Sequence, residues 1–388
     1  MKRLLIVLVL VFIVGCTVQK PMQLPPSPDE PPIAKAEETS VEVPVEAPEP
    51  KEAPEDFREL QQQPEVTPPY PIASQLDVPK INVLCDKNPC LDYLGAYAMA
   101  ARYYDNGIDL VSVVGYGGMG SDVKMRSNKG IDNAVGHTGM IIATQNYGFA
   151  YDLGLALDGN PSSDKYSLRF HDHADKIDYF NNRDDALDRL RRAISAKDPV
   201  IVYLDVTELQ SQFAEQSDFW KRWPGDKKGH FMVVTGYDAD HVYLNDPNDY
   251  DGKDLKATNR EFQLAWEATK FLPEKLGPLW MMKLKRSKDI RKNWEDVVEA
   301  NNVAGKNAID QLQEFAAKGM KTDESCAQLS ALAKTRELYS SFLERYEYSL
   351  ASSMYDDSAD FLRYACEEGI QENVKKASYK EENAQNAI

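Results

Sequence analysis

One stretch of the chain constrains its fold more than any other: "GHFMVVTGYDADHVYLNDPN", which begins at Gly229. Two apolar runs, 231–235 and 241–245, flank a short polar segment that contains Gly and Asp, and this pattern predicts a β-hairpin. Further strand patterns, "PVIVYLDV" and "MMKLKR", also fall late in the chain, after stretches of helical periodicity. Helices that come first and strands that come later predict an α+β domain with an antiparallel sheet over residues 81–286.

The ends of this hairpin carry two residues with catalytic chemistry. A turn centred near Asp238 places His230 directly across from Asp246, because both are equally far from it along the chain. Opposed residues on paired strands have Cβ atoms about 4.5–5.5 Å apart. A carboxylate that holds one ring nitrogen of a histidine fixes its tautomer and stabilises the imidazolium. The hairpin alone fits either a catalytic pair that lacks its nucleophile or a structural pair that caps the hairpin.

The candidate nucleophile is Cys90, in "NPCLDYLGAYAMAARYYDNG". Apolar residues recur there at helical spacing, with Asn88 as the expected N-cap and Pro89 at the first helical position. Cys90 is then expected in the first turn, where free N–H groups and the helix dipole favour a thiolate. Two alternatives stay open: a small core residue, or a disulfide with Cys85 that blocks the thiol.

Residues 287–388 contain little glycine or proline, and three helical stretches predict a small bundle: 294–319, 323–350 and 358–377. We find no catalytic motif in this part, so we expect it to serve packing or partner binding.

Two cysteines of this bundle are expected to pair. If the chain reverses near Tyr346, Cys326 and Cys366 are each about 20 residues from the bend and lie at the same height on antiparallel helices. Their Cα atoms then come within the roughly 4.4–6.8 Å that a disulfide needs. A closed loop of about 40 residues stabilises by roughly 3–4 kcal/mol in the loop-entropy model.

The N-terminus indicates export. The apolar run from Leu4 to Val14 is too short to span a bilayer and has the length of a secretory signal. The segment that ends at Cys16 resembles the lipobox of bacterial lipoproteins, which implies a signal peptide over residues 1–16, with cleavage before Cys16 and lipidation of that residue. Residues 17–80 hold 15 of the 22 prolines and many glutamates, so we expect a disordered stalk.

Charge and motifs exclude several functions. The net charge is -17 and no basic stripe occurs, which argues against a nucleic-acid partner. We expect no metal site and no cofactor. The expected partners are the membrane, through the lipid on Cys16, and a peptide or amide substrate at the cell envelope.

The order Cys, His, Asp along the chain resembles that of papain-like cysteine proteases. The hairpin is similar to that of the C39-like peptidase domain. The stretch from Cys90 to the Tyr-Tyr pair, followed by "GYGGMG", resembles the related butirosin-biosynthesis acyltransferase type. The resemblance implies a papain-like fold in which Cys90 is the nucleophile, His230 the base and Asp246 the orienting carboxylate.

Two departures from the family pattern bear on activity. Papain-like enzymes usually place a Gln five or six residues before the Cys, and here those positions hold Cys85 and Leu84. Asn88 and Asn82 are the candidates for the missing oxyanion donor. The acyltransferase type often has His directly before the Cys, where this chain has Pro89. The expected function is therefore a membrane-anchored thiol hydrolase, with a catalytically inactive C39-like binding module or an acyltransferase as alternatives.

Overall fold

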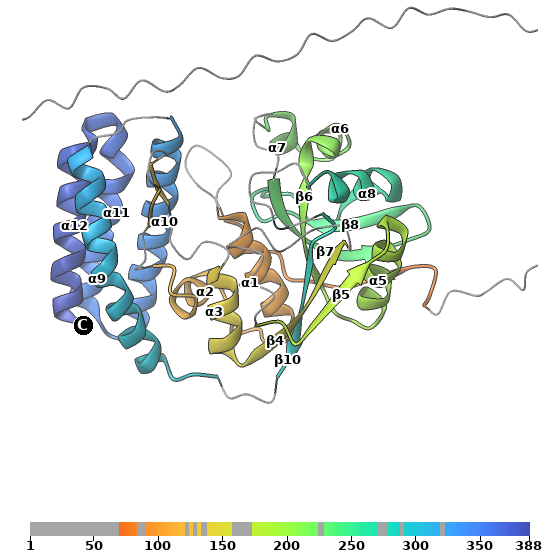
Figure 1. Ribbon diagram of the computed structural model, residues 1–388, viewed down its shortest axis with the longest axis horizontal. Helices are drawn as coiled ribbons and strands as arrows, with labels where there is room; N and C mark the ends of the chain where they lie inside the picture. Colours follow the sequence, from red (N-terminus) through yellow and green to blue (C-terminus); the bar gives the residue numbers. More distant parts are fainter. Residues whose placement is uncertain are drawn as a thin grey trace, which may run out of the picture. The chain divides into compact units, whose positions relative to one another are not determined.

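The computed structural model (Figure 1) describes residues that all belong to one compact unit, Val66–Ile388. The predicted signal peptide, Cys16 and most of the predicted stalk lie outside the described residues, which are 70–83, 91–120, 124–126, 130–132, 138–156, 173–223, 229–269, 276, 278–287, 291–318 and 323–388. Within these ranges no helix combines the length and the apolar character that a membrane span requires.

An eight-stranded sheet forms the centre of the first part, in the order β5-β4-β10-β6-β7-β8-β9, with β1 paired to β7. All neighbours are antiparallel except β4 and β5. The predicted α+β class with an antiparallel sheet is therefore confirmed. The strands are β1 (Ser74–Gln75), β4 (Phe149–Ala156), β5 (Lys176–Phe180), β6 (Val200–Asp205), β7 (Gly229–Tyr237), β8 (His241–Asn245), β9 (Leu255–Thr258) and β10 (Met281–Arg286), and a separate two-stranded sheet pairs β2 (Lys124–Arg126) with β3 (Gly130–Asp132).

Helices cover both faces of this sheet. Every residue of β6 is buried, as expected of a central strand that is covered on both sides. In Figure 1, α1 lies on one side of the sheet and α5 on the other. The helices of this part are α1 (Asp92–Tyr104), α2 (Leu110–Tyr116), α3 (Thr138–Tyr147), α5 (Arg183–Ser195), α6 (Gln210–Ala214), α7 (Asp218–Lys221) and α8 (Asn259–Ala268), with a 3₁₀ turn η2 (Val206–Glu208).

The boundary of the predicted stalk needs a correction. Residues 70–80 were assigned to the stalk, but they are packed into the folded part together with 81–83. Leu76 and Val78 are buried, and β1 lies within this stretch. The apolar residues alternate here, which is the strand pattern that the high proline content of the preceding residues obscured.

The C-terminal bundle has four helices and not three: α9 (Trp294–Lys318), α10 (Asp323–Arg345), α11 (Ser349–Glu368) and α12 (Ile370–Ala387). The third predicted helix, 358–377, is divided at Gly369. This residue has a φ of 135°, a conformation that glycine adopts readily and other residues rarely do, so the chain turns there.

The glycine-rich segment "GYGGMG" serves as a docking surface for the bundle. A Cβ atom on Gly115 would lie 2.4 Å from the ring of Phe342, and one on Gly120 would lie 2.1 Å from Cβ of Tyr339. Asn301 donates a hydrogen bond to the carbonyl of Gly115 at 2.8 Å. Because any side chain at these glycines would push α10 away, their role here is close packing.

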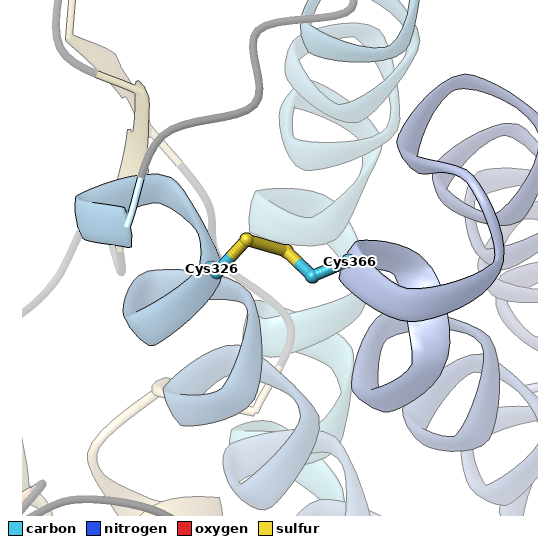
Figure 2. Close-up of a disulfide and its surroundings, with 2 residues drawn as sticks. All are labelled: Cys326 and Cys366. Atoms are coloured by element: carbon cyan, nitrogen blue, oxygen red, sulfur yellow. A yellow bond between two sulfur atoms is a disulfide. The ribbon is translucent and has the colours of Figure 1, made fainter.

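A disulfide joins Cys326 of α10 to Cys366 of α11, with a Cα–Cα distance of 5.7 Å (Figure 2). The chain reverses between Arg345, the last residue of α10, and Ser349, the first of α11. The bend thus lies near Tyr346, as the sequence predicts, and this brings the two cysteines to the same height on neighbouring helices. The bond closes a loop over a sequence separation of 40 and so restricts the unfolded chain.

Candidate functional site

His230 lies on β7 in the interior, with a relative exposure of 1%. Its Nε2 atom is 2.8 Å from Oδ1 of Asp246, so the structure brings these two residues together. The same Oδ1 accepts a hydrogen bond from the backbone N–H of Asn248 at 2.8 Å. Asp246 is fully buried directly after the end of β8.

The strand register that predicted this contact is wrong in detail. Val233 pairs with Asn245, and a bulge interrupts the register between Val234 and Gly236. The N–H of Asp238 donates to the carbonyl of His241 at 2.9 Å, so the turn centres later than Asp238. Asp246 follows Asn245, the last paired residue of β8, and is not directly opposite His230. It contacts the histidine diagonally across the two strands.

A second carboxylate, which sequence reasoning missed, holds the other ring nitrogen. Oδ2 of Asp92 is 2.9 Å from Nδ1 of His230 and also accepts the backbone N–H of Phe231 at 2.7 Å. Its Oδ1 accepts the N–H of Tyr93 at 3.0 Å. Asp92 is the first residue of α1, where the helix dipole favours a negative charge. The sequence signal was available, since an acidic residue opens the same helical pattern that drew attention to Cys90.

The predicted start of this helix is wrong. It begins at Asp92 and not near Asn88, with Leu91 as its N-cap, and Leu91 makes no side-chain capping bond. Leu91 has a φ of 54°, the left-handed conformation, so the chain bends sharply into the helix. The bonds of Asp92 to β7 fix this starting point. Cys90, which was expected in the first turn, lies outside the described residues.

Four predicted residues near this point lie outside the described part of the chain: Cys85, Asn88, Pro89 and Cys90. The other oxyanion candidate, Asn82, is described. Its side-chain oxygen accepts a hydrogen bond from the ammonium of Lys80, within the segment that packs beside the Asp246 turn.

The two carboxylates determine the protonation of His230. Burial alone lowers the pKa of the imidazole, but the charges and hydrogen bonds of Asp246 and Asp92 outweigh it and raise the pKa to about 10. At neutral pH the ring is therefore an imidazolium, and both of its N–H groups donate to carboxylates.

Two tryptophans enclose the ring. The centroid of His230 lies 5.1 Å from that of Trp223 and 5.9 Å from that of Trp220, both in edge-to-face arrangements. The two indoles stack on each other at 4.5 Å, and both are buried. The result is an apolar wall that keeps water from the described side of the imidazolium and strengthens its bonds to the carboxylates.

This arrangement limits the chemistry of the described site. A general base needs a ring nitrogen that is free to accept a proton from a nucleophile. Both nitrogens of His230 are bonded to carboxylates, so in this geometry neither of them contacts a nucleophile among the described residues. In the described ranges, no group of three or more His, Cys, Asp or Glu residues has the arrangement of a metal site.

Comparisons with known proteins relate part of the chain to one family. Residues 87–274 match the model of the Peptidase_C39 like family. A crystal structure from Bacillus anthracis, of a protein proposed to be a C39-like peptidase, is similar at 18% sequence identity and a TM-score of 0.33. The similarity covers 56% of this chain and 99% of that one. No curated protein matches. The family match thus supports a C39-like domain with a papain-like fold over residues 87–274, similar to the Peptidase_C39 like family.

Proposed function

We propose that this C39-like domain binds peptides and does not cleave them through a thiol. The observation that carries the proposal is the state of His230: Asp246 holds Nε2 at 2.8 Å and Asp92 holds Nδ1 at 2.9 Å. In a Cys-His-Asp triad, one nitrogen faces the orienting carboxylate and the other faces the nucleophile. Here Asp92 occupies the place of the nucleophile. The peptide class follows from the peptidase family alone.

The second candidate is the thiol hydrolase that the sequence favoured, with Cys90 as nucleophile. The family match spans both Cys90 and His230, and Cys90 is only two residues from Asp92. Catalysis on this route requires Asp92 to leave Nδ1 so that a thiolate can pair with the imidazolium. The acyltransferase alternative requires the same rearrangement, and nothing in the described geometry favours it.

A library of fluorescence-quenched random octapeptides separates the two candidates. For a binding module, we expect peptides to be retained on immobilised full-length protein and recovered uncleaved, both from the wild type and from Cys90→Ala. Release of fluorescence by the wild type that Cys90→Ala abolishes would establish the hydrolase instead. Full-length protein carrying the exposed substitution Lys253→Met is the control for an unrelated surface change and should retain the same peptides, because among the described residues Lys253 pairs with Asp77, at 3.1 Å.

We propose further that a lipid on Cys16 holds the chain at the membrane of the cell envelope. The support is the short apolar run that ends at Cys16. Cys16→Ala should move the protein from the membrane to the soluble fraction and remove the acyl mass from the intact protein. Unchanged fractionation and mass would contradict the anchor.

A further inference from the structure

Residues 70–83, which connect the N-terminal stretch to the domain, pack along the hairpin and the turn that carries Asp246. The backbone N–H of Leu76 donates to the carbonyl of Thr235 at 2.7 Å. The N–H of Val83 donates to the carbonyl of Pro247, also at 2.7 Å. The side chain of Asn248 returns a bond to the carbonyl of Val83 at 2.8 Å. The 70–83 segment is thus bonded to β7 on one side of its centre and to the Asp246 turn on the other.

Lys80 lies at that centre, and its ammonium group holds the backbone of the turn. It donates to the carbonyl of Asp249 at 2.7 Å, and also to the carbonyl of Asp246 and to Oδ1 of Asn82. These three acceptors use all three hydrogens of the ammonium. The two contacts within the turn go to main-chain oxygens, so Lys80 fixes the path of the main chain from Asp246 to Asp249.

The carboxylate of Asp246 depends on this placement. Its Oδ1 accepts from both His230 and Asn248. Among the described residues, no hydrogen-bond donor reaches its buried Oδ2. A shift of the turn therefore breaks the bond to Nε2 of His230 without offering Asp246 a replacement partner.

We infer that Lys80 is a positioning residue that holds the Asp246 turn against His230. The 70–83 segment, which leads toward the predicted anchor, thereby becomes part of the site. The inference goes beyond the proposed function, because it rests on the His230 cluster and holds whether the domain binds or cleaves its peptide.

A purely electrostatic role for Lys80 makes the opposite prediction. Burial lowers the pKa of Lys80, and the charges of Asp246, Asp249 and Asp251 counter this in part, which leaves it at about 8. At neutral pH the positive charge of Lys80 repels the imidazolium that Asp246 and Asp92 stabilise. Removing only this charge raises the pKa of His230, whereas releasing the Asp246 turn lowers it.

The test is an NMR titration of the His230 ring in full-length protein with 13C-labelled histidine. The chain has five histidines, so His230→Gln identifies the resonance. We expect Lys80→Met to lower the pKa of His230 by one unit or more, a tenfold or greater loss of proton affinity. Lys80→Arg keeps the charge and the hydrogen-bond donors, so it should retain most of the proton affinity of His230. Asn82→Ala keeps the charge of Lys80 but removes one of its partners, and should give a smaller shift in the same direction.

Lys253→Met is the matched control, because it removes one lysine that is bonded to the same segment, at Asp77, and not to the backbone oxygens of Asp246 and Asp249. It should leave the pKa of His230 unchanged. If the pKa of His230 in Lys80→Met is equal to or higher than that in the wild type, the positioning role is overturned. If Lys80→Met does not fold, an unchanged pKa in Asn82→Ala overturns it.

Discussion

Asp92→Cys, made together with Cys85→Ser and Cys90→Ser, should create a thiol that reacts with iodoacetamide about tenfold faster at pH 6 than free cysteine does. The new thiol takes the place of a carboxylate that lies 2.9 Å from the His230 imidazolium. A thiol beside an imidazolium and at a helix N-terminus reaches a pKa of about 5, against about 8.5 when free, and is therefore mostly ionised at pH 6. The lower intrinsic nucleophilicity of a stabilised thiolate reduces the gain to about tenfold.

The measurement is the rate of alkylation at position 92 as a function of pH, read by peptide mass analysis. Asp184→Cys in the same background is the matched control, since Asp184 lies in the first turn of α5 and, within the described part of the chain, is bonded to Gln263 and not to a histidine. The pH midpoint of alkylation in this control variant reports the effect of a helix N-terminus without a neighbouring histidine. Coincident midpoints for the two variants would refute the placement of Asp92 opposite Nδ1 of His230.

Asp246→Asn should lower the free energy of unfolding by about 3–5 kcal/mol at pH 6, because it leaves a buried imidazolium with a neutral partner at Nε2. The folded pKa of His230 is about 10, above the value of about 6.5 that an imidazole has in the unfolded chain. The stabilisation from proton binding is therefore fully present below about pH 6.5 and lost as the pH rises through about 10. The loss of unfolding free energy caused by Asp246→Asn should therefore be smaller at pH 10 than at pH 6.

Urea unfolding at pH 6 and pH 9.5 checks this difference. Asp109→Asn serves as the control, because burial raises the pKa of Asp109 but its bonds to Arg345 and Ser112, which do not titrate in this range, outweigh it and hold the pKa below its usual value. Its carboxylate is ionised at both pH values, so the cost of its substitution should not change between them. An equal cost of Asp246→Asn at the two pH values would contradict a carboxylate-stabilised imidazolium.

The sequence allowed correct predictions where local pattern decides the outcome. Two apolar runs on either side of a short polar segment predicted the hairpin, and the spacing of Cys326 and Cys366 from one bend predicted that the two would meet. The α+β class followed from the order of such patterns along the chain. Each of these features depends on residues that are neighbours within one or two elements.

The parts that the sequence did not predict depend on contacts between distant segments. In its local sequence, Asp92 is an ordinary acidic residue at the start of a helix. Only the packing of α1 on β7 brings it to His230. The bulge between Val234 and Gly236 shifts the register, and although a glycine in a strand often marks a bulge, Gly236 alone does not give the new pairing. Lys80 lies 166 residues from Asp246, in a stretch whose prolines favoured the interpretation as stalk.

The most direct test of the account is the reactivity of Cys90 in the wild-type protein. Because Asp92 occupies Nδ1 of His230, we expect Cys90 to lack the imidazolium partner that would depress its pKa. Alkylation of Cys90 in mildly reduced full-length protein should then follow a midpoint near the free value of about 8.5. A midpoint below about 6.5 that returns to the free value in His230→Gln would show that Cys90 pairs with His230, and would contradict the binding-module account.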